Sequence, residues 1–277
     1  MISTFKGIRV GSITIGGGNP FVLIAGPDVI ESEEFALSAA HRLQEICLEE
    51  KVPFIFKCSY DKANRTSLRS FRGPGLERGL EILQKVKETV GVKVLSDVHC
   101  CEEVQKASEV LDVVQIPAFL SRQTDLLLEV ARHARAINIK KGQFLSPWDV
   151  QSLLEKIHSV RPEGVMVTER GTTFGYNNLV VDFRSLVVLR GLGCPVVFDG
   201  SHTVQLPGGL GSASGGQREF IPPLCRAAVG TGIDALFLEV HPDPDRALCD
   251  GPSSYRLEEL PPLIQTLKRI DSIVKGT

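Results

Sequence analysis

Short apolar runs recur along the chain, and each is followed by a segment with helical periodicity. The first run, FVLIAGP, precedes SEEFALSAAHRLQEICLEE, in which apolar residues return every three or four positions. Seven further pairs follow, and their apolar runs are PFIFKCS, KVLSDVH, VVQIPAF, AINIKK, GVMVTERG, PVVFDGSH and ALFLEVH. Continuous apolar strands are typical of parallel sheets covered on both faces, and their alternation with helices indicates βαβ units.

Eight strand–helix pairs favour one closed barrel. They occupy roughly 250 residues without a linker or a break in composition, which fits a single (β/α)8 TIM barrel better than a doubly wound sheet of two halves. Before the first run, GIRVGSITIGGGNP predicts a short N-terminal β-hairpin. We therefore expect one α/β domain over residues 1–277, with the hairpin in residues 1–20 and the barrel in residues 21–277.

Composition and charge restrict the kind of partner. The chain has 277 residues, of which 43% are apolar, and a formal net charge of −2 at pH 7. Such a chain can bury a substantial core, but it has no general attraction for nucleic acid or for an acidic membrane. Any basic site must therefore be local, and its ligand is expected to be small and anionic.

Cysteine usage and the absence of apolar spans bear on the compartment. Seven cysteines are scattered without a C-x-x-C pair, which indicates reduced thiols. No stretch approaches the roughly 20 apolar residues that span a bilayer, and no secretion signal is recognisable at the N-terminus. We expect a cytoplasmic protein with small-molecule partners.

Polar side chains gather where the predicted strands end, which is where TIM barrels carry their active sites. A single charge there needs no explanation, because strand ends meet solvent. Polar or charged residues at all eight ends are different, because a lumen filled with Val, Ile and Leu does not require them, and they indicate an active site. In chain order they are Asp28, Lys57, Ser59, Asp97, His99, Arg122, Lys140, Glu169, Arg170, Asp199, His202, Glu239 and His241.

Five cations belong to these strand ends or to the loops that follow them. They are Lys57, Lys62, Arg122, Lys140 and Arg170. No neutral sugar requires five cations, whereas phosphate and carboxylate do, because Arg binds oxyanions in a bidentate manner and Lys supplies a point charge. The ligand is expected to carry several negative charges.

Longer stretches resemble the 3-deoxy-D-manno-octulosonate 8-phosphate synthase family. They are FKCSYDKANRTS, SFRGPGLERGL, SDVH, QIPAFLSRQTDLL, NIKKGQFLSPW, TERGTTFGYNNLVVD, DGSHTVQLPGG, ASGGQREF and EVHPDPDRALCDGPSS. They cover nearly the whole chain in the family's order. The related aromatic-pathway synthases, which use erythrose 4-phosphate, typically carry a KPRTS-type segment where this chain has KANRTS.

The resemblance implies a transferase of lipopolysaccharide sugar biosynthesis. Its members condense phosphoenolpyruvate with D-arabinose 5-phosphate and water, and they release the eight-carbon sugar acid phosphate and inorganic phosphate. By motif, the residues around the phosphoenolpyruvate carboxylate would be Lys57, Ser59 and Lys62. Those around its phosphate would be Arg122, Lys140, Arg170 and the backbone of Ala118.

The resemblance also implies a pentose site and an assembly. Asn64 and Asp97 would face the pentose. Arg65 and Thr66 would reach the site of a neighbouring subunit in a homotetramer and bind the arabinose phosphate; the family usually has Ser where Thr66 stands.

The reaction requires catalytic groups as well as cations. C3 of phosphoenolpyruvate attacks the aldehyde while water adds to C2, so the aldehyde must be polarised and the water positioned. The candidates are Lys62, His202 and Asp250, with Asp97 beside the pentose. The sequence does not apportion the proton transfers among them.

The resemblance leaves a metal ion open. Metal-dependent members carry Cys after the GP that ends the first strand and metal-independent members carry Asn, whereas this chain has Asp28. His202, Glu239 and Asp250 match the other ligand positions in both branches. A carboxylate at Asp28 could complete a site suited to Mn²⁺, Mg²⁺ or Fe²⁺ more than to Zn²⁺, but Asp also has the shape of Asn. Without a cation, Asp28, Glu239 and Asp250 would crowd one pocket and raise the pKa of at least one carboxyl, which favours a weak, exchangeable metal.

Two other functions are compatible with parts of this pattern. A Schiff-base aldolase or lyase could use Lys57 or Lys140, because a lysine at a barrel strand end is a common imine former. A non-catalytic phosphosugar-binding protein would need only the cations. The presence of Asp97, His202, Glu239 and Asp250 argues against such a protein.

Overall fold

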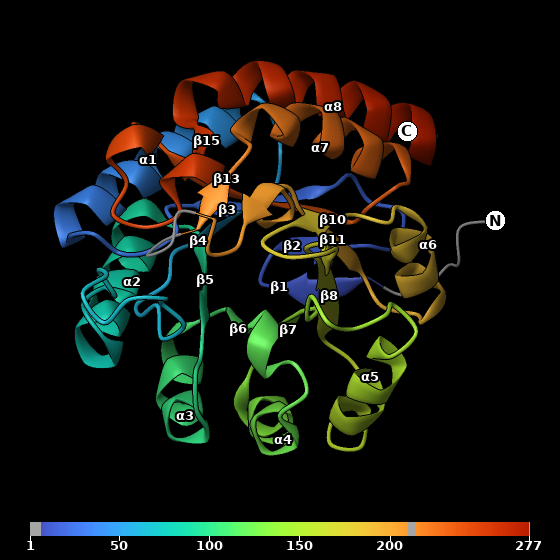
Figure 1. Cartoon of the computed structure of the whole chain (residues 1–277), viewed down its shortest axis with the longest axis horizontal. Coiled ribbons are helices and arrows are strands. Elements are labelled where there is room, and N and C mark those ends of the chain that lie inside the picture. Colours follow the sequence, from blue (N-terminus) through green and yellow to red (C-terminus); the bar gives the residue numbers. More distant parts are fainter. Residues whose placement is uncertain (1–6, 210–213, 277) are drawn as a thin grey trace.

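The computed structural model describes residues 7–209 and 214–276, and in them it confirms the predicted TIM barrel (Figure 1). Eight parallel strands form one closed ring, because each pairs with the next and the last, β14, pairs with both β11 and β3. The barrel strands are β3 (Val22–Gly26), β4 (Phe54–Lys57), β5 (Lys93–Asp97), β6 (Val113–Ile116), β7 (Ile137–Lys140), β8 (Val165–Glu169), β11 (Val196–Asp199) and β14 (Ala235–His241).

Helices alternate with these strands and form the outer layer of the barrel (Figure 1). They are α1 (Glu33–Glu49), α2 (Leu76–Val90), α3 (Cys101–Val110), α4 (Thr124–His133), α5 (Val150–His158), α6 (Arg184–Gly191), α7 (Ile221–Gly230) and α8 (Leu260–Lys275). Each buries an apolar stripe against the sheet, as Leu80, Leu83 and Val86 of α2 do. In the described part of the chain, no helix is both long and apolar enough to cross a membrane.

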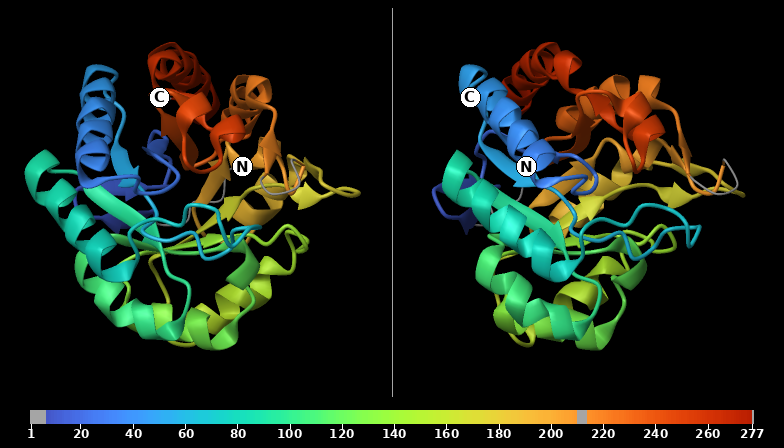
Figure 2. Two further views of the ribbon diagram at one scale, coloured as in Figure 1. Left: turned by 60° about the vertical axis from the view of Figure 1, so that its left-hand side comes forward. Right: turned by 90° about the vertical axis from the view of Figure 1, so that its left-hand side faces the viewer.

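The predicted N-terminal hairpin closes one end of the barrel. Strands β1 (Ile8–Val10) and β2 (Ile13–Ile15) pair antiparallel, and Ile8, Val10 and Ile15 are buried in one cluster with residues of the barrel strands. The hairpin lies at the end opposite to the long loops that follow the strands (Figure 2). Residues 1–6 of the predicted hairpin region lie outside the described residues.

The lumen is layered, because alternate residues of each strand point inward. The layer above the hairpin is apolar and includes Ile24, Leu95 and Phe237. Above it, Asn138 Nδ2 donates to Gln115 Oε1 at 2.9 Å, and Thr168 Oγ1 donates to Asn138 Oδ1 at 2.6 Å. This polar layer was not expected from the sequence, and it supports the charged side chains at the carboxyl ends of the strands.

Two short hairpins extend the loops at that end. They are β9 (Thr172–Thr173) with β10 (Leu179–Val180), and β12 (Gln205–Leu206) with β13 (Gly215–Gly216). Strands of two residues have no detectable periodicity, so the sequence did not predict them. A further short strand, β15 (Tyr255–Arg256), pairs with the end of β14.

Candidate active site

A cavity of about 390 Å³ opens at the carboxyl ends of the barrel strands. Most of the residues predicted from the sequence line it together. They are Lys57, Lys62, Asn64, Arg65, Thr66, Asp97, Ala118, Lys140, Arg170, His202, Glu239 and Asp250. The strand-end pattern therefore located a cavity lined by charged side chains.

Other predicted residues lie outside the lining of the cavity. Asp28 and Ser59 are buried directly behind it, where Ser59 Oγ donates to Asp97 Oδ1 at 2.5 Å. Arg122 is exposed and does not line the cavity, so its contact with a phosphate stays a prediction. Glu169 and His241, which the strand-end pattern included, also do not line it.

The position of Glu169 corrects the expectation that every polar strand end serves the cavity. Glu169 lies between Thr168 and Arg170, which both face the lumen, so it points outward. Its Oε2 accepts a hydrogen bond from Ser185 of α6 at 2.8 Å. His241 is likewise held elsewhere, because its Nε2 lies 3.3 Å from Glu31 Oε1 and its Nδ1 accepts from the backbone N–H of Asp243.

Two lysines and two carboxylates form a buried cluster at the ends of β3, β4 and β14. Lys57 Nζ donates to Glu239 Oε1 at 2.6 Å and to the backbone oxygen of Asp28 at 2.9 Å. Lys62 Nζ lies 2.5 Å from Asp28 Oδ1. Burial opposes ionisation of Asp28, but Lys62 and Lys57 hold its pKa well below the usual range. Burial and the Asp28 charge raise the pKa of Glu239 to about 8, as expected for crowded carboxyls.

Lys57 and Lys62 supply cations on one side of the cavity, and Lys140 and Arg170 form a second group of cations, here called the cationic wall. Lys140 Nζ donates to Asp199 Oδ2 at 2.6 Å and lies 3.8 Å from the centre of the Phe237 ring. Arg170 is 5% exposed, and its Nη2 donates to Gln205 Oε1 at 3.2 Å. Its Nε and Nη1 are buried without a hydrogen-bond partner among the described residues. Unpaired buried donors are costly, so this guanidinium is arranged for an anionic acceptor.

His202 lies between these two groups. Its Nδ1 is 2.8 Å from Asp199 Oδ2, and its Nε2 is 3.7 Å from Asp250 Oδ2. Burial and the neighbouring Lys140 lower the pKa of His202, although Asp199 opposes the change. A neutral imidazole whose Nε2 faces the cavity can accept or relay a proton.

A chain of hydrogen bonds leads from the cavity to α3. His99 Nε2 lies 3.2 Å from Asp97 Oδ2, and His99 Nδ1 lies 3.2 Å from Glu103 Oε2. Tyr60 donates its hydroxyl proton to the same Glu103 oxygen at 2.8 Å. Burial opposes the imidazolium, but the bonds to Asp97 and Glu103 raise the pKa of His99 to about 10. His99 therefore adds a cation to the site.

The loop after β14 closes the cavity. Asp250 has a left-handed backbone (φ 49°), and its Oδ2 accepts from Gln205 Nε2 at 2.6 Å. Arg65 contacts Cys249 through Nη1 and lies 3.7 Å from Asp250 Oδ1. In the single chain, Arg65 thus packs against the loop after β14 of the same chain, and its predicted reach into a neighbouring subunit stays a prediction.

The candidate metal ligands converge around Asp28. One ligand atom from each of Asp28, His202 and Glu239 can lie within 4.8 Å of the others, and so can one from each of Asp28, Cys249 and Asp250. Asp28 Oδ2 and Glu239 Oε2 are buried without hydrogen-bond partners among the described residues. These donors fit a divalent ion. The ammonium groups of Lys57 and Lys62 already offset the carboxylate charge, however, so charge balance alone does not require a metal.

Several lining residues are not among those predicted from the sequence. They are neutral or come from loops, as Gln115, Gln143, Gln205 and Cys249 do. The alternation along β6 could have placed Gln115, because it lies two residues after the buried Val113. The positions of the others depend on the paths of loops, and loop sequences show no hydrophobic periodicity from which a path could be predicted.

Known proteins resemble this chain over nearly its whole length. Residues 3–276 match the family described as the DAHP synthetase I family. A 2-dehydro-3-deoxyphosphooctonate aldolase of Geotalea uraniireducens is 61% identical over 270 residues, 98% of this chain and 99% of the relative. Proteins with the same name from Geobacter sulfurreducens and Trichlorobacter lovleyi are 59% and 57% identical, with 97% and 98% of this chain covered and 98% and 99% of the relatives.

Proposed function

Because the chain belongs to the DAHP synthetase I family, and within it to the 2-dehydro-3-deoxyphosphooctonate aldolases, we propose that it is a phosphoenolpyruvate-condensing transferase. It joins phosphoenolpyruvate to D-arabinose 5-phosphate with addition of water, and it releases 3-deoxy-D-manno-octulosonate 8-phosphate and inorganic phosphate. The product belongs to lipopolysaccharide sugar biosynthesis.

One observation carries this proposal. The Nε and Nη1 donors of Arg170 are buried beside Lys140 without partners among the described residues, so the cavity contains a fixed oxyanion site. Lys57 and Lys62 supply a second cationic region in the same cavity. Two such regions suit the phosphate and the carboxylate of phosphoenolpyruvate.

The remaining lining residues suit the second substrate and the bond-forming step. Asn64 and Asp97 offer polar contacts for the pentose, and Arg65 offers for its phosphate an Nε that has no hydrogen-bond partner in the part of the chain that the structure describes. A C–C bond forms between C3 of the enol and the aldehyde carbon, water adds to C2, and phosphate leaves from C2. Lys62 can stabilise the charge that develops on the aldehyde oxygen, and His202 with Asp250 can orient the water.

The test is a direct assay. The protein is incubated with both substrates, and the loss of enol absorbance is followed together with phosphate release. Stoichiometric release that depends on both substrates is expected. No turnover, with or without added divalent metal, would refute the proposal; binding of both ligands by calorimetry without product would point to a binding protein.

A lysine imine is disfavoured by the surroundings of the two candidate lysines. Burial alone would lower the pKa of Lys57, but Glu239 and Asp28 raise it above the ordinary value, which keeps the amine protonated. Burial lowers the pKa of Lys140, yet its ammonium is paired with Asp199. Trapping of a keto substrate by borohydride would reveal an imine, and we expect none.

A divalent ion is compatible with the site. It would be held by Asp28, His202, Glu239 and Asp250, and it would act as a Lewis acid towards the aldehyde oxygen. We propose a weak, exchangeable site. Activity is measured after exhaustive chelation and after readdition of Mn²⁺, in wild type and Asp28→Asn: loss restored by Mn²⁺ establishes the metal, and full activity of the chelated wild type excludes an essential one.

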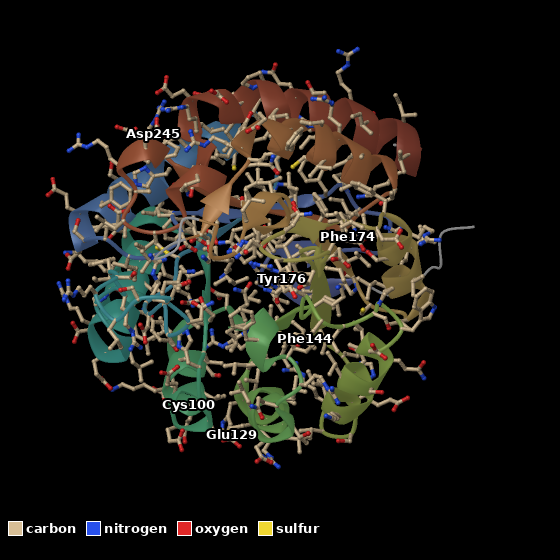
Figure 3. The ribbon with its side chains drawn as sticks, in the orientation of Figure 1. Cys100, Glu129, Phe144, Phe174, Tyr176 and Asp245 are labelled. Carbon is tan, nitrogen blue, oxygen red and sulfur yellow. The ribbon has the colours of Figure 1, made fainter. Side chains whose placement is uncertain are left out.

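We further propose a homotetramer in which Arg65 and Thr66 approach a neighbouring site. Large apolar side chains are exposed on the loops that follow the strands, among them Leu68, Phe144, Phe174 and Tyr176. Figure 3 labels three of these aromatic residues. Exposed apolar side chains are typical of protein interfaces when they form a contiguous patch.

A cytoplasmic location is proposed from the thiols. All seven cysteines are free, and Cys47, Cys58, Cys194, Cys225 and Cys249 are buried. Free thiols are typical of a reducing compartment.

A further inference from the structure

Behind the cationic wall of Lys140 and Arg170 lies a buried ion pair that contacts neither the cavity nor solvent. It consists of Lys141, which is 0% exposed, and Glu169, which is 1% exposed. Lys141 Nζ and Glu169 Oε1 are 3.6 Å apart. Each residue is the immediate chain neighbour of one of the two cavity cations.

Strand alternation explains why this pair lies behind the site. Lys140 and Arg170 point into the barrel, so Lys141 and Glu169 point outward, between the sheet and its outer layer. The backbone N–H of Lys141 donates to the oxygen of Thr168 at 2.9 Å, which continues the pairing of β7 with β8 past its last residues. The pair therefore lies at the same level as the two cavity cations, on the reverse face of the sheet.

Glu169 fixes the backbone that carries Arg170. Its Oε1 accepts from the N–H of Gly171 at 2.7 Å, and its Oε2 accepts from Ser185 Oγ at 2.8 Å. Gly171 has a φ of +91°, a left-handed conformation that L side chains rarely adopt. The carboxylate thus spans Arg170 and anchors the turn on which it lies to α6.

Lys141 fixes the loop after β7 to the loop after β8. Its Nζ donates to the backbone oxygen of Leu145 at 3.1 Å and to Thr172 Oγ1 at 3.2 Å. The two loops meet again where the N–H of Thr173 donates to the oxygen of Gln143 at 3.0 Å. Gln143 lines the cavity, so the ammonium group also holds one wall of the site.

We propose that Lys141 and Glu169 are positioning residues that set the geometry of the oxyanion site formed by Lys140 and Arg170. Neither residue lines the cavity. The buried charges are expensive to desolvate, and they are retained because each fixes a segment that carries a cavity cation. The choice of phosphoenolpyruvate as the anion bound there rests on the proposed function.

The test separates positioning from general stability. Lys141→Met keeps the length of the side chain but leaves Glu169 buried and unpaired. We expect the KM for phosphoenolpyruvate and its calorimetric dissociation constant to rise about 10-fold or more. A loss of this size is found for metal affinity when the hydrogen-bond partners of metal ligands are removed. The KM for D-arabinose 5-phosphate should change less than about 3-fold, because its contacts lie on other loops.

Adding Glu169→Gln to Lys141→Met should restore most of this affinity. The glutamine side chain can still bond to Gly171 and Ser185, and no unpaired buried charge remains. If Lys141→Met does not fold, Glu169→Gln alone and the double variant provide the same comparison of the two substrates.

Arg190→Met is the matched control. Arg190 is another buried cation, and it donates to the backbone oxygen of Thr231 at 2.8 Å near the other end of the barrel. The Arg190→Met substitution should lower the unfolding midpoint without changing the affinity for phosphoenolpyruvate.

Two results would overturn the positioning role. One is an unfolding midpoint lowered by Lys141→Met with both KM values within about 2-fold of wild type. The other is an equal rise of both KM values. If the wild type shows no turnover but binds phosphoenolpyruvate, and Lys141→Met weakens that binding, the proposed function fails while the positioning role stands.

Discussion

Single side chains in the cavity are held by hydrogen-bonded partners before any ligand binds. Lys57 is held by Glu239, and Lys140 by Asp199. Such pairing fixes each ammonium group, so little reorganisation remains when an anion arrives. Truncation of one partner would leave a buried charge unpaired, and its cost would exceed the value of the lost contact.

Arg65→Ala is expected to weaken D-arabinose 5-phosphate much more than phosphoenolpyruvate. A charge-assisted contact to phosphate contributes about 1.5–3 kcal/mol, or roughly 10- to 100-fold in KM. Steady-state kinetics with each substrate varied in turn measures the difference. Arg69→Ala, an exposed position in the same loop, should change neither KM. Equal losses for both substrates, with the oligomer intact, would contradict the assignment.

At the scale of elements, strands approach so closely that some positions admit no side chain. Gly26 ends β3, and a Cβ added to it would lie 1.9 Å from the backbone oxygen of Lys57 in the adjacent strand β4. Neighbouring backbone cannot yield as a flexible side chain can. The close contact between Gly26 and the backbone of Lys57 therefore also fixes the position of Lys57 along the barrel axis.

Gly26→Ala is expected to separate β3 from β4 and to lower the free energy of unfolding by about 1–3 kcal/mol. Activity should fall as well, because Lys57 moves with β4. Urea denaturation checks the stability. Gly230→Ala is the control, because a Cβ at Gly230 in α7 meets open space and alanine favours a helix. An unchanged midpoint for Gly26→Ala would show that the strands can adjust.

His99 links β5 to α3, and its charge gives stability a pH dependence. Its pKa is raised to about 10, from an ordinary value of about 6.5. Its contribution is therefore complete below about pH 6.5 and is lost as the pH rises through about 10. His99→Gln should lower the free energy of unfolding by about 1–3 kcal/mol at neutral pH and flatten its decline towards pH 10.

Urea unfolding between pH 6 and pH 10 tests this, with the exposed His158→Gln as the control. Parallel pH profiles for wild type and His99→Gln would show that the imidazolium contributes nothing to folding.

The elements differ in how well the sequence predicts them. The barrel strands and helices were predictable, because burial imposes a period on each, and the strand ends then located Lys57, Lys140 and Arg170. The outward direction of Glu169 follows from the same alternation, which the strand-end pattern alone does not take into account. Gln205 and Cys249 could not be placed, because loop paths are set by tertiary contacts that leave no local pattern.

At the scale of the whole molecule, exposed apolar groups lie on the loops that follow the barrel strands, at the end where the cavity opens. Tyr176 is 99% exposed and Phe174 is 67% exposed, on the segment between β9 and β10. A single chain gains nothing from holding such groups in water. This surface is where we expect neighbouring subunits to meet.

If the proposed tetramer forms, Phe174→Ser with Tyr176→Ser is therefore expected to shift it towards smaller species while the barrel stays folded. Sedimentation velocity measures the mass, and circular dichroism measures the fold. The control is Ile273→Ser, because Ile273 is 81% exposed near the end of α8, away from the mouth. An unchanged mass for the double variant would place the interface elsewhere.

The hairpin that closes the barrel also dictates an order of events during synthesis. Ile8, Val10 and Ile15 are made before the barrel strands, yet they share their cluster with Ala235 and Phe237 of the last barrel strand, β14. They cannot be fully buried until β14 has emerged and the ring has closed, and contacts between such distant parts of a chain form slowly. The amides of the hairpin that closes the barrel should therefore be among the last to be protected from hydrogen exchange. Pulse-labelled hydrogen exchange during refolding would show this as late protection of the β1 and β2 amides, and early protection would mean that the hairpin forms on its own.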